Sequence, residues 1–138
     1  MTKFIALACV LPLLAFFILQ YSLDIKNSHI KGNAETIVVA ACEQAKQEGC
    51  FTPEIIESMK MEFEKAGIDS DKVIIGDGTT TTPKYRTDEF DSREMIDYKI
   101  GVPIDNIFAA QSFFGLTDEE NSYIKYYFGK LASERLNE

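Results

Sequence analysis

One uncharged apolar run near the N-terminus limits what this chain can fold into. Residues 4–19 contain no charged side chain, and the thiol of Cys9 is their only polar side-chain group. As an α-helix the run is about 24 Å long, and extension to Leu23 gives about 30 Å, one hydrocarbon thickness of a bilayer. Tyr21 would then lie at the interface, where aromatic rings are favoured. We predict a transmembrane anchor over residues 1–23, with these anchor residues: Phe4, Leu11, Pro12, Leu13, Leu14, Phe16, Phe17 and Leu19.

Lys3 is the only charge before the apolar run, so the positive-inside rule predicts a cytoplasmic N-terminus and an extracytoplasmic body. A cleaved signal peptide is the main alternative, although the apolar run is slightly long for one and no clear small-x-small site follows it. Residues 6–9 (ALAC) also resemble a lipoprotein cleavage box, but the apolar run before them is too short and the run after them too long.

The rest of the chain is acidic. All 22 acidic residues and 13 of the 14 basic residues lie beyond Gln20. A body of this charge repels phosphate backbones, so we expect no nucleic-acid partner. Its length suits one domain, and we expect residues 24–138 to form a single extracytoplasmic domain.

Residues 24–48 predict an amphipathic helix that continues the anchor, because no proline separates the two. We expect one long helix, kinked at Pro12 because proline lacks an amide donor. Most of its apolar face should pack on the chain's own sheet, and the remainder on neighbouring copies. The predicted helix packing face is Ile30, Ala34, Ile37, Val38, Ala41 and Ala45.

Cys42 and Cys50 are candidates for a disulfide, since disulfides persist outside the cytoplasm. On one straight helix the two thiols would be too far apart to bond. Gly49 is a natural helix terminator, and a chain reversal there could bring Cys50 back. The other interpretation is that both are small core residues.

Thr52 and Pro53 predict the start of a second helix, as N-cap and first helical residue, and Gly67 predicts its end. Its expected buried stripe is Ile55, Ile56, Met59, Phe63 and Ala66.

Residues 72–75 read as a short strand that residues 79–82 could extend. Residues 84–93 read as an exposed loop. Alternation over residues 95–104 predicts the clearest strand, which Pro103 should end or place at an edge.

Residues 105–116 are apolar and aromatic without a clear period. We expect Phe108, Phe113, Phe114 and Leu116 to close one end of the core, with an exposed contact patch as the alternative. The spacing of Thr117 and Glu120 matches a capping box. The residues that follow fit either a helix or a strand.

No catalytic or metal-binding constellation is apparent in the sequence. His29 is the only histidine, so neither a triad nor a histidine-ligated metal is supported. Asp69, Asp71 and Asp77 lack the spacing of a calcium loop and read as helix-exit and turn residues. We expect no enzymatic activity and no cofactor.

The arrangement resembles type IV pilins and pseudopilins, and most closely the tight-adherence minor pilins and their Gram-positive relatives. Residues 8–14 (ACVLPLL) are similar to the family's N-terminal segment. Residues 43–67 are similar to its pattern of helix, G-x-x-T-P link and second helix. Three C-terminal stretches, residues 101–104 (GVPI), 113–116 (FFGL) and 132–136 (ASERL), are similar to motifs of the Gram-positive proteins.

The resemblance implies an α+β, pilin-like fold with a small antiparallel three-stranded sheet, and therefore one turn of helix at 117–121 followed by a strand at 123–133. It also implies a non-catalytic subunit of a pilus or tight-adherence secretion assembly, held in the cell membrane and able to enter a surface filament. The implied partners are membrane lipid, other pilin-like subunits or a secretion platform. Type IV prepilins carry a glutamate where this chain has Ala6, after a leader ending in glycine. That departure fits a priming or accessory subunit retained in the membrane. The alternative function is a signal-anchored binding or sensor domain.

Overall fold

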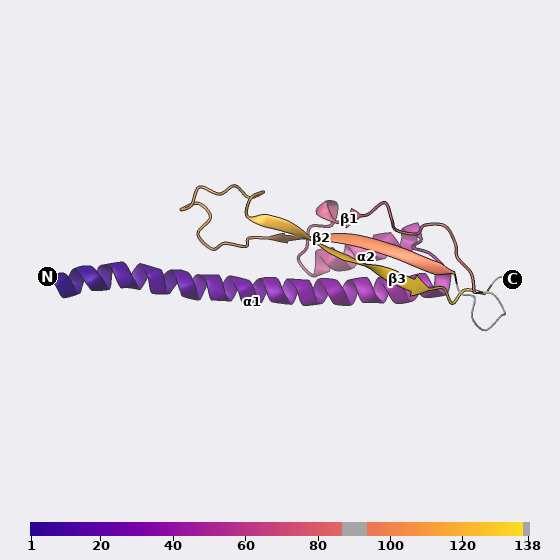
Figure 1. The fold of residues 1–138 in the computed structure, drawn as a ribbon, viewed down its shortest axis with the longest axis horizontal. Coiled ribbons are helices and arrows are strands. Elements are labelled where there is room, and N and C mark those ends of the chain that lie inside the picture. The colour runs from indigo at the N-terminus through magenta and orange to yellow at the C-terminus, as the bar shows by residue number, and fades with distance from the viewer. Residues whose placement is uncertain (87–93, 137–138) are drawn as a thin grey trace. The chain divides into compact units, whose positions relative to one another are not determined.

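The structure is a computed structural model that describes residues 1–86 and 94–136. Its elements are helix α1 (Thr2–Glu48), helix α2 (Pro53–Lys65), the 3-10 turn η1 (Ser70–Lys72) and strands β1 (Ile74–Ile75), β2 (Met95–Asp105) and β3 (Ser122–Ala132), all drawn in Figure 1. The strands form one antiparallel sheet in the order β1-β2-β3. The predicted α+β fold, with a long N-terminal helix, a second helix and a three-stranded sheet, is confirmed.

The described chain divides into two compact units. The first comprises Met1–Lys31 and Ile104–Tyr123, and the second comprises Gly32–Pro103 and Ile124–Glu138. Helix α1 contributes residues to both. Leu23, the predicted end of the membrane anchor, lies inside the first unit and not at its edge. The division between anchor and extracytoplasmic domain at residues 23 and 24 stays a prediction.

The core of the second unit is built mainly from side chains of α1, α2 and β2. In Figure 1, β2 and β3 run beside the part of α1 that belongs to this unit. The predicted packing face of α1 is largely buried here: Ala34, Val38, Ala41 and Ala45 are at most 5% exposed, and Ile37 is half-buried. The other buried core side chains include Ile55, Met59 and Phe63 of α2 and Ile96, Ile100 and Val102 of β2. Burial of this apolar surface drives the packing of the second unit.

Helix α2 begins and ends where its sequence signals predict. The hydroxyl of Thr52 accepts a hydrogen bond from the Ile55 amide at 3.3 Å, and Pro53 is the first helical residue. At the other end Gly67 adopts φ +80°, and the Ile68 amide donates to the Phe63 carbonyl at 2.9 Å. This is a Schellman ending, which satisfies carbonyls that the helix itself leaves without donors.

The sheet has a short edge strand. Ile74 pairs with Gly101, and Ile75 pairs with Ile100. Beyond β1 the chain does not extend the strand over residues 79–82 as expected. Instead the Thr79 hydroxyl accepts from the Lys99 amide at 3.1 Å and donates to the Lys99 carbonyl at 3.2 Å. The Thr79 side chain therefore bonds to backbone groups of β2 that a longer β1 would have paired.

One further expectation about the backbone is corrected, and the kink expected at Pro12 stays a prediction. Pro103 does not end β2, which continues to Asp105, and β2 is the central strand. This is possible because β1 pairs only with Ile100 and Gly101, so Pro103 lies beyond the paired stretch of that edge. Pro12 lies inside α1, which is helical on both sides of it.

The C-terminal expectation is confirmed. Residues 118–121 form a turn and β3 follows as a strand over Ser122–Ala132. The predicted loop at 84–93 falls mostly outside the described residues.

Candidate functional site

The apolar N-terminal part of α1 is exposed. Among the described residues, α1 is the one helix long and apolar enough to cross a membrane, and none of its most apolar window is buried. Every predicted anchor residue is exposed except Phe16, which is half-buried. Phe4, Phe17 and Leu19 are at least 60% exposed. In a water-soluble helix such a surface would be unfavourable, whereas in a bilayer it costs nothing.

An aromatic loop, residues 106–116, lies against this part of α1 in the first unit. The Gln20 side chain donates to the Ile107 carbonyl at 2.8 Å and accepts from the Ala109 amide at 3.1 Å. The Asn27 side chain donates to the Asn106 carbonyl at 3.2 Å. Two amide side chains of one helix therefore fix the start of the loop along the helix axis.

Asn121 holds the loop closed from its other end. Its side-chain oxygen accepts from the Phe108 amide at 2.7 Å, and its nitrogen donates to the Phe108 carbonyl at 3.2 Å and to the side chain of Gln111. Asn121 is 1% exposed, so these bonds are made out of water, where each missing partner would be costly. Asn121 could not be singled out from the sequence, because a lone asparagine gives no periodic signal.

The predicted capping box forms just before Asn121. The Thr117 amide donates to the Glu120 carboxylate at 2.9 Å, and the Glu120 amide donates back to the Thr117 hydroxyl at 3.3 Å. These bonds to the backbone and hydroxyl of Thr117 lower the pKa of Glu120.

The expectation that the loop's aromatic residues close the core is wrong. Phe108, Phe113 and Phe114 are 48%, 86% and 60% exposed, and only Leu116 is half-buried. The Phe114 ring instead meets the Phe16 ring edge-on, with centroids 6.4 Å apart. The loop is held by polar bonds to α1 and Asn121, which leaves its aromatic rings free to face outward. The exposed-patch alternative is the one observed.

A groove of about 550 Å³ runs between α1 and the aromatic loop. Its lining is apolar at Leu19, Leu23 and Phe108, and Lys26 adds one positive charge. These apolar side chains, together with Lys26 and the polar Ser22, Asn106 and Gln111, suit an amphipathic ligand.

The cysteine pair lies in the second unit. Cys42 and Cys50 are both buried free thiols, so the disulfide is not formed in this structure. Cys42 lies near Tyr98 of β2, and burial raises the pKa of its thiol to about 11. Gly49 reverses the chain with φ +84°, as expected, yet each thiol ends in the core, which matches the interpretation of small core residues.

The outer face of the sheet carries a second apolar surface. Ile124, Tyr126 and Phe128 of β3 are 40%, 41% and 74% exposed. The Lys99 ammonium lies 4.8 Å from the centroid of the Tyr126 ring. A groove of about 350 Å³ adjoins this surface, with Val39 of α1 in its lining. Exposed apolar side chains on an edge strand are typical of contact surfaces.

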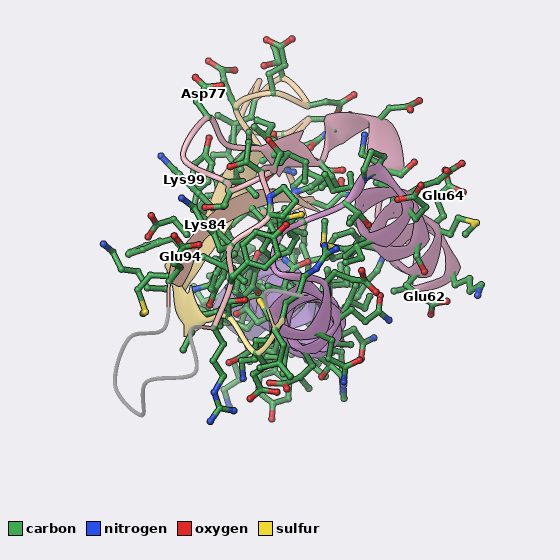
Figure 2. All side chains as sticks on the ribbon, turned by 90° about the vertical axis from the view of Figure 1, so that its right-hand side faces the viewer. Glu62, Glu64, Asp77, Lys84, Glu94 and Lys99 are labelled. Carbon is green, nitrogen blue, oxygen red and sulfur yellow. The ribbon has the colours of Figure 1, made fainter. Side chains whose placement is uncertain are left out.

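Acidic side chains on the second unit lie at its periphery. Figure 2 shows Glu62 and Glu64 of α2 and Asp77 directed outward. Asp69, one of the three aspartates considered for calcium, caps η1 by accepting from the Asp71 amide. Within residues 1–86 and 94–136, no group of three or more His, Cys, Asp or Glu side chains could hold a metal ion.

No family model, curated protein or solved structure matches this chain.

Proposed function

We propose that the protein is a membrane-anchored structural subunit of the pilin-like type, with no catalytic role. One observation carries the proposal: a single helix, Thr2–Glu48, supplies both an exposed apolar segment and the packing face of an α+β head. The apolar segment would anchor the chain as a single-pass protein with its N-terminus in the cytoplasm. The head would be extracytoplasmic.

The exposed surfaces support a role in assembly. In lipid, transmembrane helices associate through close packing of their side chains. The exposed apolar half of α1 is available for such packing. The outer face of β3, with Tyr126 and Phe128, offers a second contact area on the head. Partners of this kind are other pilin-like subunits or the membrane platform of a secretion system. A minor pilin or pseudopilin of a tight-adherence system is the particular form we propose.

The first experiment locates the chain and its N-terminus. We expect a C-terminally tagged chain to remain in the membrane fraction after alkaline carbonate extraction, and N-terminal sequencing to begin at Met1 or Thr2. Carbonate removes peripheral proteins and leaves spanning helices in place. A tagged protein in the culture supernatant that lacks residues 1–22 would contradict membrane retention.

A second experiment separates a structural subunit from a solitary binding domain. A photo-crosslinking amino acid at Phe128 should give crosslinks to a further copy or to another protein with an apolar N-terminal helix. The same amino acid at Asp77, an exposed turn position, is the matched control and should give none. A chain that stays uncrosslinked at Phe128 in its native membrane would argue for the binding or sensor alternative.

A further inference from the structure

We infer that the aromatic loop, residues 106–116, lies inside the bilayer, in the leaflet on the head side of the α1 span. The inference rests on the proposed membrane anchor and adds a second lipid-embedded element to it. Its ligand is the acyl-chain region of the lipid itself.

The position of the loop along α1 sets its depth. Phe16 precedes Leu23 by seven residues, so at 1.5 Å per residue it lies about 10 Å inside the end of the predicted span. Phe114 contacts Phe16, and Gln20 holds Ile107 and Ala109 about one helical turn nearer the interface. The loop and the span belong to the same compact unit. Whatever medium surrounds Phe16 therefore also surrounds Phe114.

The loop's composition suits that medium. Residues 106–116 contain no charged side chain, while Asp105 and Asp118 flank them. Phe113 and Phe114 are the most exposed of the loop's three phenylalanines. In water, two adjacent exposed rings with no charged neighbour would be unfavourable. In the hydrocarbon region of a leaflet the same rings gain apolar contacts.

Part of the loop's backbone is hydrogen-bonded as the hydrocarbon region requires, where no water can satisfy a free amide. From Phe113 to Leu116, each backbone N–H donates to a carbonyl of the same loop, at 3.0 to 3.4 Å. The Phe108 and Ala109 amides donate to the side chains of Asn121 and Gln20.

The adjoining groove adds a place for a lipid chain. Leu19, Leu23 and Phe108 form its apolar part, and Lys26 lies about one turn beyond Leu23, at the level expected for phosphate headgroups. A second copy of the chain could also cover the phenylalanines, and the experiment below distinguishes that case.

Depth-dependent fluorescence quenching tests the inference, and the chain has no tryptophan of its own. Phe113→Trp is made in the full chain and reconstituted in phosphatidylcholine vesicles whose acyl chains are brominated either near the headgroup or near the chain end. We expect at least a twofold loss of fluorescence, stronger with bromine near the chain end than near the headgroup, and little quenching by aqueous iodide.

Two reference variants show whether a negative result concerns the membrane anchor or only the loop. Leu11→Trp reports the span and should be quenched most by bromine near the chain end. Met61→Trp, on the exposed face of α2, should be quenched by iodide and not by lipid. If Leu11→Trp escapes lipid quenching, the anchor itself is overturned, and the loop inference with it.

If Leu11→Trp is quenched by lipid while Phe113→Trp responds to iodide, the loop lies in water and the inference alone fails. If Phe113→Trp responds to neither quencher, protein covers it, which also overturns the inference. Should Phe113→Trp fail to fold, as judged by circular dichroism, Phe108→Trp provides the same measurement at a less exposed position of the loop.

Discussion

Gly101 of β2 lies directly against Tyr126 of β3: a Cβ atom at position 101 would come within 2.8 Å of the tyrosine Cε1. The same atom would lie 2.9 Å from Cγ2 of Ile124. The two β3 side chains therefore cover the space that the glycine leaves open, as aromatic residues do across strands. Any side chain at position 101 would force them away.

We predict that Gly101→Ala lowers the free energy of unfolding by about 1–3 kcal/mol, the usual cost of overpacking. Urea denaturation of the full chain in detergent micelles measures it. Gly78→Ala is the matched control, because no atom lies within 4 Å of a Cβ built there. Equal midpoints for the two variants would show that β3 does not cover Gly101 this closely.

A second prediction concerns the glycine that ends α1. Gly49 has φ +84°, and a Cβ there would overlap the Lys84 carbonyl oxygen. Gly67 has a similar φ of +80° with no atom near its Cβ. Gly67→Ala should therefore cost about 1–2 kcal/mol of backbone strain alone, and Gly49→Ala should cost more. The difference between their unfolding free energies isolates the contact with Lys84, and a difference of zero would contradict it.

The third prediction is a loss of stability at alkaline pH. The pKa of Cys42 rises from 9.0 to about 11 in the folded chain because burial disfavours the thiolate. The folded state therefore holds the proton more tightly than the unfolded state. The resulting stabilisation is complete below pH 9 and is lost as the pH rises towards 11, by roughly 2–3 kcal/mol.

Cys42→Ala should flatten this pH dependence, measured as urea midpoints between pH 8 and pH 11 in steps of about half a unit. Tyr98, whose pKa burial also raises, keeps part of the slope. Cys9→Ala serves as the control, since Cys9 is exposed and lies outside the second unit. An unchanged slope in Cys42→Ala would contradict the assignment to this thiol.

A fourth prediction counts the thiols. The unfolded, unreduced protein should show three reactive cysteines, because Cys9, Cys42 and Cys50 are all free in the structure. A count of one would instead establish the disulfide between Cys42 and Cys50 that the sequence left open. Colorimetric thiol titration in denaturant makes this measurement.

The fifth prediction addresses the polar bonds that hold the aromatic loop. Asn121→Ala removes the partners of the Phe108 amide and carbonyl, at a cost of about 1–3 kcal/mol. Hydrogen exchange of the Phe108 amide in micelles should accelerate by at least tenfold, which corresponds to about 1.4 kcal/mol. Asn121→Asp keeps the acceptor and should exchange at an intermediate rate.

Asn33→Ala, on an exposed face of α1, is the matched control and should leave the exchange unchanged. If Asn121→Ala also exchanges at the wild-type rate, Asn121 does not hold the loop.

The sequence by itself determined the helices and the central strand. Their signals are local: Thr52 and Pro53 begin α2, Gly67 ends it, and alternation over residues 95–104 marks β2. The face of α1 from Ala34 to Ala45 was predictable because helical periodicity repeats within one segment. An uncharged apolar run likewise identifies itself without reference to any other part of the chain.

Only the tertiary structure decided which residues far apart in the sequence form hydrogen bonds with one another. The length of β1 depends on the Thr79 hydroxyl, which satisfies Lys99 twenty residues away. The exposure of Phe113 depends on Gln20 and Asn121, whose amide groups fix the loop from two separate elements. A single buried amide leaves no periodic pattern in a sequence, so hydrogen bonds between segments far apart in the chain can be seen only once it has folded.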